Sequence, residues 1–196
     1  MENISAREYR LAASEQCKEY SSTLAVIYLV HALIVSALSA ASFGLLGLLV
    51  IGPLLMGLAM ISEDVDKKNV VSLESLFKGF KMFEHAFVLA LLETVYLFLW
   101  SLLIIPAFIK PYSYAMSFFI QKDNPDMTAN ECITESRRIM DGNKWKLFCL
   151  EFSYIGWVIL CILTLGILSF WVSPKMNQAK YLFYLHITGK DMVAEE

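Results

Sequence analysis

Long apolar runs constrain the fold of this chain more than any other feature. They occupy residues 24–42, 43–61, 86–109 and 147–172. A helix needs about 20 apolar residues to cross the ~30 Å hydrocarbon core of a bilayer, and each run is close to that length or longer. Because 57% of the residues are hydrophobic and 18% are charged, the composition is also too apolar for an ordinary soluble fold. We therefore expect an all-α polytopic membrane protein.

The last two runs are each followed by a weaker one, at 111–121 and 174–187, and the basic residues indicate whether these also cross. Short cytoplasmic loops collect Lys and Arg. If both weaker runs cross, every Lys and Arg except Lys110, Lys175 and Lys180 lies on the cytoplasmic side. The sequence therefore predicts about six transmembrane helices in three hairpins, with both termini in the cytoplasm.

An internal repeat supports the same count. A single shift without a gap places Gly79 on Gly142 and Pro111 on Pro174, and a fainter third copy contains Pro53. Each unit would be an amphipathic interfacial helix, a long span and a returning span that carries a proline. Chance matching between apolar stretches is the alternative. We interpret the chain as one integral membrane domain, 1–196, with repeat units at approximately 5–62, 72–122 and 128–188.

The three prolines of the returning spans, Pro53, Pro111 and Pro174, are candidate helix kinks. Proline has no backbone N–H, so a carbonyl one turn earlier loses its partner if the helix continues. Freed carbonyls line polar cavities in transporters that are built from broken helices. Packing is the favoured alternative, because small residues four positions after a proline suit the close approach of another helix.

A charged stretch interrupts the second half of the chain between residues 124 and 148. Asn124 and Pro125 end the preceding helix, and Thr128 and Glu131 have the spacing of a capping box, so a new helix begins there. Its apolar face follows helical spacing through Ala129, Cys132, Ile133, Ser136 and Met140. Such a helix is too polar to span a bilayer and is expected to lie in the membrane interface.

Two further segments repeat this design. Ser5 and Glu8 form another capping-box pattern before a short helix, and residues 72–83 carry an apolar side made of Leu73, Leu76, Phe77, Phe80 and Phe83. We interpret the three helices as a cytoplasmic collar in the membrane interface rather than as solvated connectors. The interfacial basic residues of the collar are Arg137, Arg138, Lys144 and Lys146.

Glu93 and His31 form a candidate intramembrane polar site. Each lies about eight residues inside its run, or roughly 12 Å at 1.5 Å per residue, too deep to reach the headgroups easily. A charge at that depth costs at least ~2.5–3.5 kcal/mol, so polar residues there are functional candidates. The alternative for Glu93 is a neutral carboxyl hydrogen-bonded to Tyr or Ser of a neighbouring helix. Glu151 lies nearer the interface, where we expect it to pair or to reach the headgroups.

Several function classes lack their usual signals. The four cysteines form no CxxC pair and the three histidines have no ligand-like spacing, so we expect reduced thiols, no metal and no cofactor. The net charge of −3 gives no overall attraction to nucleic acid. No HExxH, GxSxG or paired intramembrane carboxylates occur, so we do not expect an enzyme. Residues 1–20 contain no apolar segment, so the first hydrophobic helix is expected to direct insertion.

A family resemblance is carried by the stretch from Asn124 to Trp157, NPDMTANECITESRRIMDGNKWKLFCLEFSYIGW. With LTLGI at 163–167, LWSLLIIP at 99–106 and YSYAM at 112–116, it resembles the bacterial integral membrane proteins of domain of unknown function 975, found mainly in Firmicutes. The likeness covers roughly residues 50–184, and the chain differs from the family pattern at Lys175 and Tyr20. The resemblance implies a multi-pass protein of the bacterial cell membrane and no established activity.

These features favour two functions. A transporter-like protein, or an export or immunity accessory that handles a lipid or a peptide, would place Glu93 and His31 in a cavity between the repeats. The alternative is a non-catalytic membrane scaffold that recruits a partner through its cytoplasmic interfacial helices. In both cases the expected partners are membrane lipid and either another membrane protein or a second copy of the chain.

Overall fold

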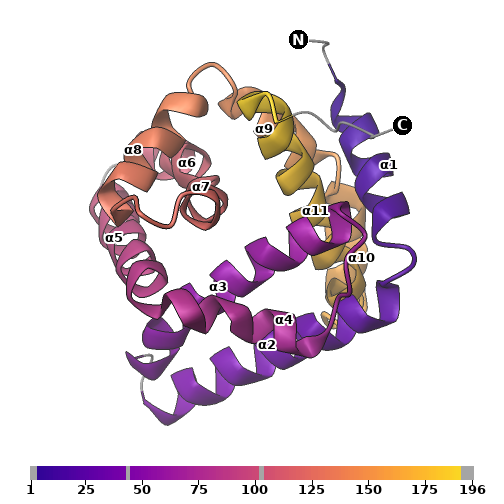
Figure 1. Ribbon diagram of the computed structural model, residues 1–196. Coiled ribbons are helices and arrows are strands. Elements are labelled where there is room, and N and C mark those ends of the chain that lie inside the picture. Colours follow the sequence, from indigo (N-terminus) through magenta and orange to yellow (C-terminus); the bar gives the residue numbers. More distant parts are fainter. Residues whose placement is uncertain (1–3, 43–44, 102–103, 191–196) are drawn as a thin grey trace.

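The computed structural model describes residues 4–42, 45–101 and 104–190, which form helices and no strand (Figure 1). The all-α fold class is therefore confirmed for this part of the chain. The first half contains α1 (Ala6–Gln16), α2 (Ser21–Ala41), α3 (Leu45–Asp66), α4 (Leu73–Phe77), the 3₁₀ helix η1 (Lys78–Met82) and α5 (Phe83–Ser101). The second half contains α6 (Ile104–Tyr114), α7 (Ser117–Asp123), α8 (Ala129–Ile139), α9 (Lys144–Phe152), α10 (Ile155–Leu163) and α11 (Ser169–Thr188).

Three helical segments of the described chain are long and apolar enough to cross a membrane. They are Ser21–Ala41, Leu46–Asp66 and Leu73–Ser101. The pair α9 and α10, which bends by 43° at its break, would be a fourth if the two helices form one span. These helices suit a multi-pass membrane protein. The arrangement of six spans in three repeated hairpins is not confirmed and stays a prediction.

The predicted run 86–109 lies partly outside the described residues, because these leave out 102 and 103. Its described parts form α5, up to Ser101, and the beginning of α6, from Ile104. That the run is one span stays a prediction.

The predicted run 147–172 is divided in the structure. α9 ends at Phe152 and α10 begins at Ile155, so the first break falls at Ser153 and Tyr154. A second break follows α10, where Leu165 and Gly166 have positive φ angles of 53° and 86° before α11 begins. Glycine adopts such angles without strain. The run therefore contributes to three helices rather than one.

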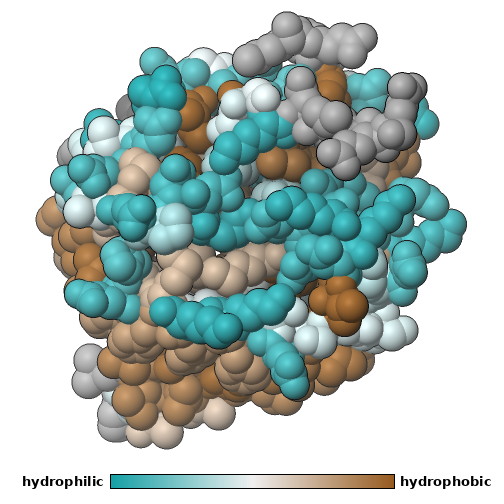
Figure 2. All heavy atoms as spheres, viewed as in Figure 1, coloured by the Kyte–Doolittle hydropathy of each residue, from teal (hydrophilic) through white to brown (hydrophobic). Residues whose placement is uncertain are grey.

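α3 is the central helix of the fold. It packs against α2, α4, η1, α5, α7 and α11. Within its most apolar window 56% of the residues are buried, whereas the corresponding share is 17% for both α2 and the segment that ends with α5. α2 and α5 therefore expose most of their apolar surface. Figure 2 shows hydrophobic residues over the lower left of the molecule, where these helices lie in Figure 1, and hydrophilic residues over the centre and top.

Glycines allow α3 to approach η1 and α4 at backbone contact. A Cβ atom at Gly79 would lie 2.0 Å from the carbonyl oxygen of Pro53 and 2.6 Å from the amide nitrogen of Gly57. A Cβ atom at Gly57 would lie 2.0 Å from the carbonyl oxygen of Leu76. No side chain fits at such distances, so both positions require glycine. Gly57 follows Pro53 by four residues, and the close approach predicted for the small residue there is confirmed.

The predicted helix caps are confirmed. Ser5 and Glu8 form a capping box at the start of α1, and Thr128 and Glu131 form one at the start of α8. Asn124 caps the C-terminus of α7, as the Asn-Pro pair predicts. The face of α8 that contains Ala129, Cys132, Ile133, Ser136 and Met140 is buried against the rest of the protein.

The segment 72–83 differs from α8 in how it uses its apolar side. It forms α4 and η1 and continues into α5, rather than forming one separate helix. Leu76 is fully buried, but Leu73, Phe77 and Phe80 are exposed. The rings of Phe77, Phe80, Phe83 and Phe87 follow one another along the surface at centroid distances of about 6 Å. The position of these segments at a membrane interface stays a prediction.

Candidate functional site

Buried polar side chains gather where α5 meets α6, α7 and α8. We call this group the buried polar cluster and define it as Glu93, Ser113, Ser117, Gln121, Cys132 and Ser136. All of its members except Glu93 are at most 3% exposed. The spacing of Ser113, Ser117 and Gln121, four residues apart, places them along one side of the α6–α7 segment. Cys132 and Ser136 have the same spacing on the buried face of α8.

The hydrogen bonds of the cluster join its helices. The Ser136 hydroxyl donates to the carbonyl of Ser113 at 2.9 Å and accepts from the backbone N–H of Met116 at 3.3 Å. The Gln121 amide donates to the carbonyl of Met127 at 2.9 Å, and its oxygen accepts from the Cys132 thiol at 3.3 Å. These polar groups are therefore satisfied within the protein.

Glu93 is the exception in the cluster. Its Oε1 atom is buried and has no hydrogen-bond partner among the described residues. Ser117 lies beside it, but the Ser117 hydroxyl donates to the carbonyl of Tyr114 at 2.8 Å. Buried carboxyl oxygens are nearly always hydrogen-bonded, and an unsatisfied one needs an explanation. Glu93 is therefore placed to accept a hydrogen bond from a ligand or to hold a proton.

The sequence predicts only part of the buried polar cluster. The sequence singles out Glu93 and predicts an apolar helix face with Cys132 and Ser136, but it gives no role to Ser113, Ser117 and Gln121. Their four-residue spacing in the weaker apolar run 111–121 was the available signal.

His31 also has a buried, unpartnered atom, Nε2, among the described residues. The structure does not unite it with Glu93. α2, which carries His31, packs on α3, α4 and α11, whereas α5 packs on α3, η1, α6, α7 and α8. The two residues therefore lie on different helices that both pack against α3, and a site that combines them stays a prediction.

The remaining predicted residues lie in varied surroundings. Pro53, Pro111 and Pro174 stand inside α3, α6 and α11, so these helices continue through them. Arg137, Arg138 and Lys146 are exposed and Lys144 is half-buried. Arg138 pairs with Glu135 at 2.6 Å, and Lys144 lies 3.9 Å from Asp141. Glu151 forms an ion pair, as expected, but its partner at 2.6 Å is Lys180 of α11.

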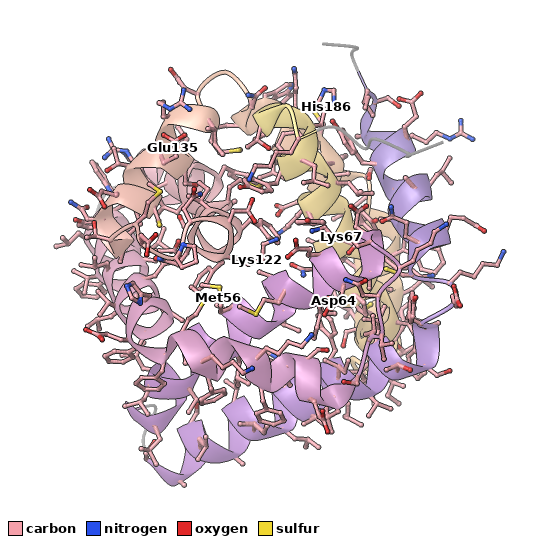
Figure 3. All side chains as sticks on the ribbon, in the orientation of Figure 1. Met56, Asp64, Lys67, Lys122, Glu135 and His186 are labelled. Atoms are coloured by element: carbon pink, nitrogen blue, oxygen red, sulfur yellow. The ribbon has the colours of Figure 1, made fainter. Side chains whose placement is uncertain are left out.

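An ion-pair network ties the end of α3 to α7 and α11. The ammonium group of Lys122 lies 2.8 Å from Glu63 and 2.9 Å from Asp123. Lys67 also pairs with Glu63, at 2.6 Å, and Figure 3 shows Lys67 and Lys122 near the centre of the view. Asp123 additionally accepts hydrogen bonds from Lys190 and from the Tyr184 hydroxyl. The network was not predicted because its members are far apart in the sequence.

Two cavities lie at other places on the surface. One, of about 490 Å³, is polar and lies between α7, α8 and α11, with Glu135, Arg138 and Lys190 in its lining. The other, of about 420 Å³, lies between α1, α10 and α11. Neither is lined by Glu93 or His31. No group of three or more His, Cys, Asp or Glu side chains suited to a metal ion occurs in the part of the chain that the structure describes.

No curated protein and no solved structure matches the chain. Residues 101–191, which contain most of the buried polar cluster, match the model of a family described as "Protein of unknown function (DUF975)". The family resemblance that the sequence motifs predict is therefore confirmed over these residues.

Proposed function

We propose that this chain is a transporter-like protein, or an accessory of an export or immunity system, that handles a lipid or a peptide in the bacterial cell membrane. The observation that carries the proposal is the buried, unpartnered Oε1 atom of Glu93. A fold that needed only a membrane span could use leucine at this position, because a charge or unsatisfied carboxyl in hydrocarbon is costly.

The surroundings of Glu93 suit a site that binds and releases a proton or a hydrogen-bond donor. The other polar groups of the buried polar cluster are hydrogen-bonded to one another or to backbone carbonyls, so they hold α6, α7 and α8 together. Among the described residues of the cluster, only Glu93 has a buried acceptor atom without a hydrogen-bond partner. Binding of a proton or of a hydrogen-bond donor there would alter the contact between α5 and this group of helices, which is how protonation is coupled to movement in transporters.

The experiment replaces Glu93 in cells that lack the native protein. Glu93→Gln keeps the shape and the hydrogen-bonding capacity of the side chain but removes its titration. Glu84→Gln is the matched control, because Glu84 is an exposed carboxylate in the first turn of the same helix. At equal protein levels, Glu93→Gln is expected to lose the phenotype that deletion exposes, such as resistance to a membrane-active peptide, and Glu84→Gln to retain it.

The alternative is a scaffold that recruits a partner through α8. The observation in its favour is Arg137, which is exposed and forms no ion pair with the described residues, next to the exposed Arg138. The double variant Arg137→Gln, Arg138→Gln separates the two functions. If it abolishes the phenotype while Glu93→Gln leaves it unchanged, the scaffold replaces the transporter-like function.

A further inference from the structure

The cavity between α1, α10 and α11 combines two cations with an apolar wall. We call it the α1–α10–α11 groove, and its volume is about 420 Å³. Its described lining consists of Arg10, Leu11, Ser14, Tyr154, Trp157, Leu168, Trp171, Val172 and Lys175. This lining contains no carboxylate, so the groove is positively charged.

The two cations of the groove have no acidic partner in the described parts of the chain. Neither Arg10 nor Lys175 lies within ion-pairing distance of a described carboxylate, whereas Lys18 pairs with Glu15 and Lys180 pairs with Glu151. The Arg10 guanidinium donates to the carbonyl of Ser153, at the break between α9 and α10. This bond fixes the guanidinium at the groove and leaves its other N–H groups available, since Arg carries five donors.

The apolar wall of the groove is continuous with an apolar surface that no other described part of the protein covers. Trp157 is 46% exposed and Trp171 is 43% exposed. None of the residues of α10 is buried, and Ile162 and Leu163 at its end and Leu165 just after it are exposed still more fully. Tryptophan and basic side chains at the edge of such an apolar surface are typical of the headgroup level of a membrane.

We infer that the α1–α10–α11 groove binds an anionic phospholipid, whose phosphate lies between Arg10 and Lys175 and whose acyl chain lies along Trp157 and Trp171. The charge and the shape of the lining support this occupant. Two unpaired cations attract an anionic headgroup, and they disfavour a zwitterionic one because it brings a cation of its own. The site is distinct from the buried polar cluster, so this inference does not depend on the proposed function.

The test uses tryptophan fluorescence of the purified full chain in a non-ionic detergent. Phosphatidylglycerol with brominated acyl chains is added, and phosphatidylcholine with the same chains is added to a parallel sample. Bromine quenches tryptophan on contact, and two of the four tryptophans line the groove. The wild type is expected to reach half-maximal quenching at a clearly lower mole fraction of phosphatidylglycerol than of phosphatidylcholine.

Lys175→Gln is the main variant, because the Lys175 side chain forms no hydrogen bond or ion pair with described residues, and the substitution is expected to leave the fold intact. Its half-maximal mole fraction of phosphatidylglycerol is expected to rise on the order of fivefold, which is the contribution of one cation near an anionic headgroup. Combining Lys175→Gln with Arg10→Gln should raise the half-maximal mole fraction further. Combining it with Arg10→Lys, which keeps the positive charge, should not. The charge-matched control is Arg7→Gln with Lys18→Gln, two exposed cations near the groove that do not line it.

Three results would overturn the inference. The first is equal quenching of the wild type by the two lipids. The second is an unchanged phosphatidylglycerol response in the Lys175→Gln, Arg10→Gln variant. The third is a lipid preference that survives replacement of both Trp157 and Trp171 by Phe, because the quenching would then report another site through the two other tryptophans.

Discussion

The ammonium group of Lys122 lies 2.8 Å from the Oε2 atom of Glu63, although 59 residues separate the two in the sequence. Only 4% of the Lys122 side chain is exposed. The same ammonium group lies 5.0 Å from the ring centroid of Tyr181, so it links α3, α7 and α11. Removing a buried cation or its partners destabilises the folded protein, because a buried charge is then left unpaired.

We predict that Lys122→Gln lowers the free energy of unfolding by about 3 kcal/mol, because Glu63 and Asp123 would each lose a buried partner. Lys67→Gln is the matched control. Lys67 pairs with the same Glu63 carboxylate, but its side chain is 59% exposed, and an exposed pair contributes no more than about 1 kcal/mol. Thermal unfolding in detergent measures both variants. Equal losses of unfolding free energy in the two variants would show that burial does not make the Lys122 ion pairs stronger than the Lys67 ion pair.

The network also predicts a pH dependence. Burial by itself would raise the pKa of Asp123, but hydrogen bonds from Lys190 and Lys122 outweigh burial and hold the pKa below its ordinary value of 3.8. The pKa of Asp123 is lower in the folded state than in the unfolded state. The stabilisation by its carboxylate is therefore fully present above the ordinary pKa of 3.8, and it is lost as the pH falls through the folded-state pKa.

Asp123→Asn should therefore be less stable than the wild type near neutral pH, and the difference should shrink in acid. Melting temperatures of the two proteins over a pH series measure it. A difference that stays constant down to strongly acidic pH would contradict the assignment of the stabilisation to the ionised carboxylate.

Glycine contacts around α3 give a packing prediction. Gly79→Ala would place a methyl group 2.0 Å from the carbonyl oxygen of Pro53, so backbone must move. We expect a loss of about 3 kcal/mol, at the upper end of the cost of overpacking. Gly156→Ala is the control, because nothing lies within 4 Å of its Cβ position in α10 and alanine favours a helix. Recovery and melting temperature in detergent compare the two, and a tolerated Gly79→Ala would refute the close contact.

Sidedness can be tested with introduced thiols. Burial raises the pKa of the Cys17 thiol to about 12 and that of the Cys132 thiol to about 11, and both side chains are buried. The native thiols would therefore resist a maleimide on either side of the membrane. Asp141→Cys and Leu165→Cys, in a chain without native cysteines, replace side chains that are 87% and 94% exposed.

If α9 and α10 form one span with the charged stretch inside, a membrane-impermeant maleimide labels Leu165→Cys in intact cells. It labels Asp141→Cys only after permeabilisation. Labelling of Asp141→Cys in intact cells would contradict the cytoplasmic position of α8. A lack of labelling at Leu165→Cys before permeabilisation would make α9 and α10 a re-entrant pair.

Local patterns in the sequence predict local features of this fold. The capping boxes at Ser5 and Thr128 depend on residues three positions apart, and the first two apolar runs correspond to α2 and α3 because each is uninterrupted. The buried face of α8 follows from helical spacing alone.

Features that depend on tertiary contacts were not predicted. Nothing near Lys122 in the sequence indicates that Glu63 is its partner, and Glu151 pairs with Lys180 rather than with the nearer Lys144 or Lys146. The break at Ser153 lies in a stretch that stays apolar, so hydropathy could not locate it. Glu93 was recognised from its cost in hydrocarbon, whereas the polar groups around it come from three other helices.

The central claim is that the Glu93 carboxyl exchanges a proton or binds a ligand, rather than serving only in packing. Infrared difference spectroscopy of the full chain in sealed lipid vesicles tests it most directly, because a protonated carboxyl has its own C=O band. We predict a band that is absent from Glu93→Gln, present in Glu84→Gln, changes with pH and shifts on transfer to D₂O. A band at Glu93 that neither changes with pH nor shifts in D₂O would contradict the account, since the carboxyl would then be sealed from any proton or ligand.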